Sequence, residues 1–206
     1  RDLLHRGGEP GRLQMNCSGK HAAMLATCVQ AGWPTASYLD PDHPLQQAIR
    51  VAVAGLAGEP VTAVGVDGCG APLFALSLAG VARAFQALVS APPLSPERTV
   101  ADAMRAHPAW TSGSRRPERA LMAAVPGLLL KSGAEGVEGF ALADGRAVAY
   151  KFEDGTSRAR PALTAALLRW LAAGGPEAAG ALEAIGEVPV TGGGRRVGSI
   201  RITLPW

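Results

Sequence analysis

Two short strand-like segments joined by a tight turn constrain the fold of this chain more than any other feature. Residues 139–143 and 146–152 are rich in apolar residues, and Asp144-Gly145 between them is a strong hairpin signal. A hairpin makes its two strands antiparallel. Most helix-like segments lie earlier in the chain, and hairpins outnumber strand–helix–strand units. This order predicts an α+β fold in which helices flank an antiparallel sheet.

Apolar periodicity and capping residues predict the remaining elements. Asp40-Pro41-Asp42 and Ser95-Pro96 are typical helix starts, because an Asp or Ser cap is combined with a proline that tolerates the first turn. We expect helices over about 21–32, 43–58, 76–89, 96–105, 117–124 and 160–173, and further strands over 61–66, 128–131 and 196–204. A chain of 206 residues is long enough for one domain with a full-sized core.

Composition and charge argue against several classes of protein. The net charge is +3, and basic pairs such as Arg115-Arg116 and Arg195-Arg196 have no aromatic neighbours, which indicates a solvated surface rather than a nucleic-acid site. No apolar run approaches the roughly 20 residues of a membrane span, and no signal peptide opens the chain. The 3 cysteines do not make a disulfide framework, so we expect a cytoplasmic protein.

The stretch QMNCSGKHAAM, residues 14–24, contains Ser-Gly-Lys and invites comparison with a phosphate-binding loop. That loop needs a glycine five positions before its Gly-Lys pair and a Ser or Thr directly after it. Gln14 and His21 occupy these two positions, and no strand precedes the stretch. The sequence therefore argues against a nucleotide phosphate site.

Two cysteines suggest a shared site. Cys17 and Lys20 are one helical turn apart at a predicted helix start, where the helix terminus and the ammonium both favour a thiolate. Cys69 follows a predicted strand in a Gly-Cys-Gly turn that allows close approach to the backbone. Thiolates are preferred zinc ligands, although both cysteines could equally be small buried residues. Cys28 lies on the apolar face of its helix, and we expect it in the core.

Three further residues are ambiguous when they are considered singly. His21 could be a ligand, a base or a substrate contact, but it could also cap or pack the helix. Asp67 is either a turn former or a carboxylate that binds an amine. Lys131-Ser132-Gly133 is similar to the Lys-Thr-Gly strand of serine β-lactamases and penicillin-binding proteins, but it could be an edge lysine before a turn.

Together these segments resemble the rhizobial-type L-asparaginases, which are also called asparaginase II or class 3 asparaginases. The likeness covers most of residues 11–170 and includes the segment 105–115. It depends on four motifs in order: Asn16-Cys17-Ser18-Gly19-Lys20-His21-Ala22, Asp67-Gly68-Cys69-Gly70-Ala71-Pro72, Lys131-Ser132-Gly133-Ala134-Glu135-Gly136 and Lys151-Phe152-Glu153-Asp154-Gly155.

The resemblance implies a serine β-lactamase-like fold, a homodimer, and hydrolysis of L-asparagine to L-aspartate and ammonia. It also implies a zinc ion, a small-molecule substrate, and no nucleic-acid or membrane partner. The roles it implies are zinc ligation by Cys17, Lys20 and Cys69, substrate binding by His21 and Asp67, and pairing of Lys131 with a catalytic serine. Arg115 or Arg116 is our candidate cation for the substrate's α-carboxylate.

One departure from the family pattern leaves alternatives open. The family's nucleophilic serine lies in a Ser-x-x-Lys turn upstream of the first motif, and residues 1–16 contain no serine. The chain also begins with Arg1 instead of Met. We therefore expect one asparaginase II-type domain over residues 1–206 that is incomplete at its N-terminus. The alternatives are a relative acting on another amide, such as glutamine, and a non-catalytic zinc-binding remnant.

Overall fold

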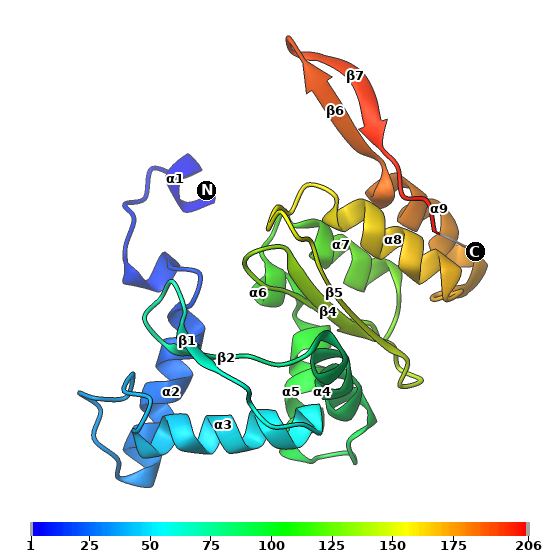
Figure 1. The fold of residues 1–206 in the computed structure, drawn as a ribbon. Helices are drawn as coiled ribbons and strands as arrows, with labels where there is room; N and C mark the ends of the chain where they lie inside the picture. The colour runs from blue at the N-terminus through cyan, green and yellow to red at the C-terminus, as the bar shows by residue number, and fades with distance from the viewer. Residues whose placement is uncertain (1, 205–206) are drawn as a thin grey trace. The chain divides into compact units, whose positions relative to one another are not determined.

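The computed structural model describes residues 2–204 and divides the chain into two compact units (Figure 1). Within the described range, unit 1 comprises the residues up to 55 and residues 59–76, and unit 2 comprises residues 56–58 and the residues from 77 onward. Helices are combined with small antiparallel sheets, which confirms the predicted α+β class. Within the described residues, no helix is both long enough and apolar enough to cross a bilayer.

Unit 1 contains two long helices and a short hairpin. Its elements are α1 (Asp2–His5), η1 (Arg12–Gln14), α2 (Ser18–Ala31), most of α3 (Pro44–Ala57), β1 (Val64–Val66) and β2 (Pro72–Phe74). α2 begins three residues before the predicted start, because Cys17 is its N-cap and the Cys17 carbonyl accepts from the His21 N–H at 3.0 Å. It ends at Gly32, whose φ of 69° is left-handed and suits glycine.

Unit 2 contains the larger sheet and most of the helices. Its elements are α4 (Leu78–Ser90), α5 (Pro96–Ala106), α6 (Pro108–Ser112), α7 (Pro117–Ala124), β3 (Leu129–Ser132), β4 (Val137–Ala141), β5 (Ala147–Lys151), α8 (Arg160–Trp170), α9 (Gly175–Gly186), β6 (Val188–Gly192) and β7 (Arg195–Ile200). The hairpin predicted around Asp144-Gly145 is the β4–β5 pair. The Ser95 cap is also confirmed, because its hydroxyl accepts from the Arg98 N–H at 3.2 Å.

The antiparallel sheet β3-β4-β5 has an apolar core on each face. On one face, Leu130 and Phe140 pack with side chains of α7, α8 and α9. On the other face, Leu129 and Ala141 pack with side chains of α4 and α5. Because side chains alternate along a strand, neighbouring leucines on β3 enter different cores. Unit 2 thus has helices on both faces of its sheet.

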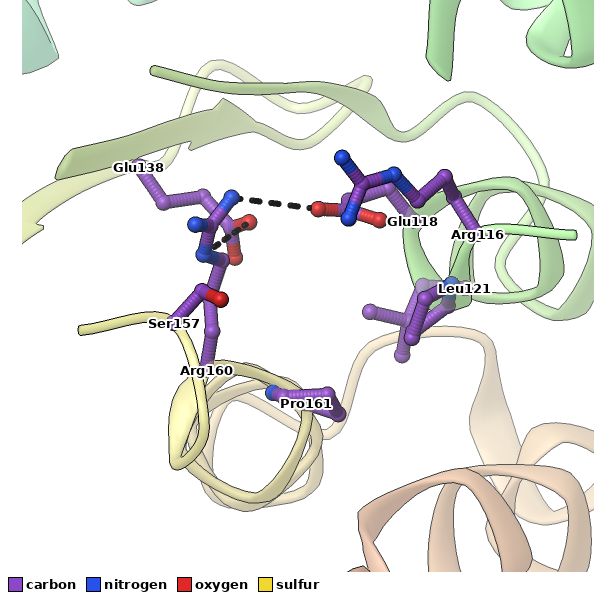
Figure 2. Close-up of a pocket in the computed structure, with 8 residues that line it drawn as sticks. Arg116, Glu118, Leu121, Glu138, Ser157, Arg160 and Pro161 are labelled. Carbon is purple, nitrogen blue, oxygen red and sulfur yellow. Dashed lines mark hydrogen bonds and ion pairs between the residues drawn. The ribbon is translucent and has the colours of Figure 1, made fainter. Parts of the chain in front are cut away.

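This alternation also separates the polar residues of the sheet. Lys131 is paired with Gly139, on the face of Leu129 and Ala141. Glu138 lies on the opposite face with Phe140, and there its carboxylate is near the guanidinium of Arg160 in α8 (Figure 2). The sheet therefore lies between Lys131 and the buried charges around Glu138.

Six elements of the described chain were absent from the sequence prediction: α1, η1, β2, α6, α9 and β6. α6 is a short segment that begins at Pro108 and stops before Gly113, too brief to show a helical period. α9 consists mainly of Gly, Ala and Glu, with few large apolar residues to mark a face. β6 contains Pro189, which is unusual within a strand unless that strand lies at an edge.

Candidate metal centre

The turn between β1 and β2 places Asp67 and Cys69 at one end of a hairpin in unit 1. The Asp67 N–H donates to Ala71 O and the Gly70 N–H donates to Asp67 O, both at 2.8 Å. Gly70 has a φ of 86°, a left-handed conformation that is strained for any residue with a Cβ. The Asp67 carboxylate also accepts from the Gly68 N–H at 2.7 Å, so the turn has little freedom.

Cys17 and Lys20 approach this turn from the first turn of α2. Lys20 Nζ donates to Asp67 Oδ2 at 2.7 Å, and the Cys69 thiol donates to the same oxygen at 3.4 Å. One donor atom each from Cys17, Asp67 and Cys69 lies within 4.8 Å of the others. We call Cys17, Lys20, Asp67 and Cys69 the thiol cluster. All four residues belong to unit 1.

The charges of the thiol cluster favour a neutral thiol beside an ion pair. Burial raises the pKa of the Cys17 thiol, and a hydrogen bond with Cys69 raises it further. The hydrogen bond from Lys20 lowers the pKa of Asp67. Desolvation acts against the charged form of Lys20, but its bonds to Asp67 and Cys69 raise its pKa overall.

The sequence interpretation of Cys17 was therefore wrong in one respect. We expected the helix start and Lys20 to favour the Cys17 thiolate. Lys20 does act in that direction, but desolvation and the Cys69 hydrogen bond act against it and are larger, so the pKa of the Cys17 thiol is raised. A metal ion that binds here must displace the thiol protons.

His21, directly after Lys20, is held by Tyr38. The His21 Nδ1 and Tyr38 hydroxyl are 2.7 Å apart, and the two rings meet edge to face. The backbone carbonyl of Tyr38 in turn accepts from the buried Gln46 side chain at 2.6 Å. This chain of contacts fixes the orientation of the imidazole on α2.

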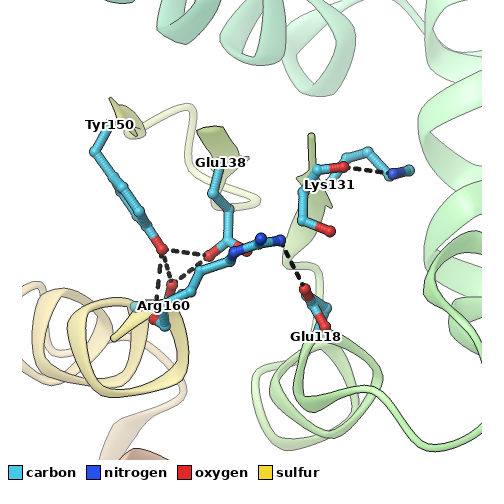
Figure 3. Close-up of polar contacts among 7 residues, drawn as sticks. Glu118, Lys131, Glu138, Tyr150 and Arg160 are labelled. Carbon is cyan, nitrogen blue, oxygen red and sulfur yellow. Dashed lines mark hydrogen bonds and ion pairs between the residues drawn. The ribbon is translucent and has the colours of Figure 1, made fainter. Parts of the chain in front are cut away.

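Lys131 belongs to unit 2 and is described separately. It is exposed near the end of β3, where its Nζ donates to Ser132 O at 2.6 Å (Figure 3). Arg115 and Arg116, the candidates for carboxylate binding, are also exposed, in the segment between α6 and α7. The sheet fixes the backbone of Lys131, while its side chain reaches the surface.

A family model described as L-asparaginase II matches residues 1–202, almost the whole chain. This chain belongs to the L-asparaginase II family. Membership implies an amidohydrolase. A search of curated proteins finds no match to the chain.

The thiol cluster of this L-asparaginase II family member fits a zinc ion by its donor chemistry. Two sulfurs and a carboxylate oxygen are all accepted zinc ligands, and ligands around tetrahedral zinc are separated by about 3–4 Å. The three donor atoms within 4.8 Å of one another need to move by only about 1 Å to reach that spacing. Cys17 and Cys69 are free thiols and are only partly buried, so an ion can reach them.

Two features of the site were missed by sequence reasoning. Asp67 was assigned to substrate binding, yet its carboxylate shares the donor cluster with both cysteines. Its position directly before Gly68-Cys69 was the available signal. Tyr38 was not singled out, because nothing in its neighbourhood indicates that it contacts His21 across 17 residues.

Proposed function

We propose that this chain hydrolyses the side-chain amide of L-asparagine to L-aspartate and ammonia beside a zinc site. The observation that carries the proposal is the thiol cluster, in which Cys17 and Cys69 come from separate elements and meet around Asp67. Family membership favours asparagine as the substrate.

Zinc would be held by Cys17 and Cys69, with Lys20 as the third ligand that the resemblance implies. Bound there, zinc supplies a Lewis acid and an anchor for the polar head of the substrate. Lys20 must first lose a proton and leave Asp67, since the two form an ion pair at 2.7 Å. Asp67 is the competing third ligand, because its oxygen already lies in the donor cluster.

The protein's own side chains have separate tasks in this proposal. The Asp67 carboxylate accepts a hydrogen bond from the substrate's α-ammonium group, and His21, oriented by Tyr38, contacts the substrate. Lys131 in its neutral form takes the proton of the nucleophilic serine hydroxyl, which the family pattern places in a Ser-x-x-Lys turn upstream of the first motif, while the serine oxygen bonds to the amide carbon. That proton leaves with the amide nitrogen as ammonia, and water then hydrolyses the ester.

A serine β-lactamase-like arrangement is part of the same proposal. Its support is the antiparallel sheet with helices on both faces and Lys131-Ser132 at the end of β3. We further propose a homodimer in a reducing compartment, the cytoplasm, which suits three cysteines that are all free thiols.

Metal analysis of the purified chain tests the zinc site. We expect about one zinc per chain and loss of most of it in Cys17→Ala and Cys69→Ala. Cys28→Ala is the matched control, because Cys28 is a free thiol that is buried in α2 away from the thiol cluster. Full zinc content in Cys69→Ala would refute the site.

Ammonia release separates the substrate alternatives. In a protein that includes the upstream Ser-x-x-Lys turn, we expect release from L-asparagine to exceed release from L-glutamine, and Lys131→Met to abolish turnover while zinc stays bound. Lys151→Met is the control, because Lys151 is also an exposed lysine near a strand end on the same sheet. Preference for glutamine would favour the relative acting on another amide, and normal turnover by Lys131→Met would remove Lys131 from the mechanism.

A further inference from the structure

Unit 2 contains a small cavity that the proposed reaction does not use. Its volume is about 50 Å³, and it is lined by Glu118 of α7, Glu138 of β4 and Arg160 of α8, with Arg116 and Ser157 at its exposed side (Figure 2). We call Glu118, Glu138 and Arg160 the acid–guanidinium cluster. The three come from three different elements, and all are buried.

Within the described residues, the hydrogen bonds of this cluster leave two carboxylate oxygens and the Arg160 Nε–H without a partner. Arg160 Nη1 donates to Glu118 Oε1 at 3.2 Å. Glu138 Oε1 accepts from the Tyr150 hydroxyl at 2.7 Å and from the Thr164 hydroxyl (Figure 3). Oε2 of Glu118 and Oε2 of Glu138 accept no hydrogen bond from any residue in the described range 2–204. Both side chains are more than nine-tenths buried.

When both of its carboxyl groups are ionised, the cluster also lacks one positive charge. Its two carboxylates face a single guanidinium, whose Nε lies 3.9 Å from Glu138 Oε2, an ion-pair distance without a hydrogen bond. Arg116 adds a guanidinium only at the exposed side, where water screens its charge. A buried negative charge without a partner is costly, so a small cation with hydrogen-bond donors suits the cavity.

We propose that this cavity binds an ammonium group, either the free ammonium ion or the end of a primary alkylammonium. A cavity of about 50 Å³ admits a body of water size, since water occupies about 30 Å³ in the liquid. An ammonium group can donate to an orphan Oε2 atom, and its charge neutralises the excess carboxylate. Water can donate in the same way but leaves the charge unbalanced. The proposal stands independently of the proposed function, although ammonia is the product assigned there.

Thermal unfolding in matched chloride salts tests the proposal. We expect ammonium chloride to raise the Tm saturably above the value in sodium chloride, by about 3–6 °C at ten times Kd. Glu138→Gln and Glu118→Gln should lose this ammonium-specific rise. Glu183→Gln, a change at an exposed glutamate of α9, should retain it. Methylammonium distinguishes the two ligand sources: a rise with it indicates that alkylammonium groups enter, and its absence indicates the free ion.

NMR of the wild-type protein with ¹⁵N-ammonium gives a second readout that does not depend on variant folding. We expect a bound ammonium resonance that Glu118→Gln or Glu138→Gln removes. An equal Tm rise with potassium would overturn the ammonium assignment, because potassium has a similar size and no hydrogen-bond donors. The absence of both the ammonium-specific rise and the bound resonance would show a hydrated or protonated cluster instead. Zinc content and ammonia release are separate measurements, so failure here leaves the proposed function unaffected.

Discussion

Asp67 is the most connected side chain of the thiol cluster. Its carboxylate accepts from Lys20, Cys69 and the Gly68 N–H, and it faces the sulfur of Cys17. Asp67 could be a zinc ligand itself, or it could position Lys20 beside a bound zinc ion. In both roles its carboxylate charge favours the ion, so removing that charge should weaken zinc binding.

We predict that Asp67→Asn lowers zinc affinity by about 10–100-fold, the usual cost of losing an outer contact of a metal site. Competition with a chromogenic chelator measures this change. Asp144→Asn is the matched control, because Asp144 is paired with Arg146 in a turn of unit 2 and should leave affinity unchanged. Unchanged affinity in Asp67→Asn would exclude both roles.

Glu138 should make stability depend on pH. Burial raises its pKa above the ordinary value of 4.5, and the charge of Glu118 adds to this, against the hydroxyl donors and Arg160. Between the ordinary pKa of 4.5 and the raised pKa of the folded state, folded Glu138 holds a proton that the unfolded chain has released. The free energy of unfolding therefore falls as pH rises through this interval.

We expect the Glu138→Gln variant to gain stability relative to wild type as pH rises from 4 to 7 in ammonium-free buffer, since glutamine does not ionise. Urea unfolding of both proteins at each pH measures the difference. Glu183→Gln is the control, because Glu183 is exposed on α9. We expect its difference from wild type in the free energy of unfolding to stay flat across the same pH values. A flat difference for Glu138→Gln as well would show that Glu138 titrates normally.

At the scale of elements, the packing of α4 against the sheet depends on a glycine. A Cβ added to Gly139 of β4 would lie 2.7 Å from the ring of Phe85 in α4. That distance is far inside van der Waals contact, and α4 cannot withdraw without uncovering the apolar face formed by Leu129 and Ala141.

We predict that Gly139→Ala lowers the free energy of unfolding by about 1–3 kcal/mol, the range for overpacking a core. Combining it with Phe85→Leu should restore part of the loss. Gly65→Ala is a strand control, because nothing lies within 4 Å of the added Cβ. Equal urea midpoints for wild type and Gly139→Ala would show that α4 and the sheet move apart to admit the added Cβ without loss of stability.

Helix caps contribute a smaller, local share of stability. Ser95 accepts from the Arg98 N–H at the start of α5, and α5 covers part of the α4 face of the sheet. We expect Ser95→Ala to cost about 1 kcal/mol and Ser95→Asp to retain most of the stability, because aspartate also caps. Urea unfolding measures both. Equal loss in the two variants would attribute the effect to something other than the cap.

At the scale of the whole molecule, the proposed homodimer has a direct test. Large apolar side chains such as Leu94 and Trp110 are almost fully exposed in the single chain, 95% and 91% respectively. Burial in an interface would remove such surface from water. We expect light scattering to give twice the 21.1 kDa mass of one chain. A particle with the mass of one chain would end the homodimer proposal.

Local patterns in the sequence predicted most of the elements. The cap at Ser95 and the Asp144-Gly145 turn each act over a few residues, and both occur as expected. Elements without such local signals were missed, α9 and β6 among them. Family membership could also be recognised from the motifs, since it rests on the order of residues along the chain.

The sequence by itself determined most of the helices and strands in their order, the antiparallel hairpin and the family. Only the tertiary structure decided that Asp67 joins both cysteines, and that Lys131 and Glu138 occupy opposite faces of one sheet. It alone brought Glu118 to Arg160, which lies 42 residues away. The reason is physical: capping and turn formation depend on neighbours in sequence, whereas burial, charge pairing and pKa depend on which distant segments pack together.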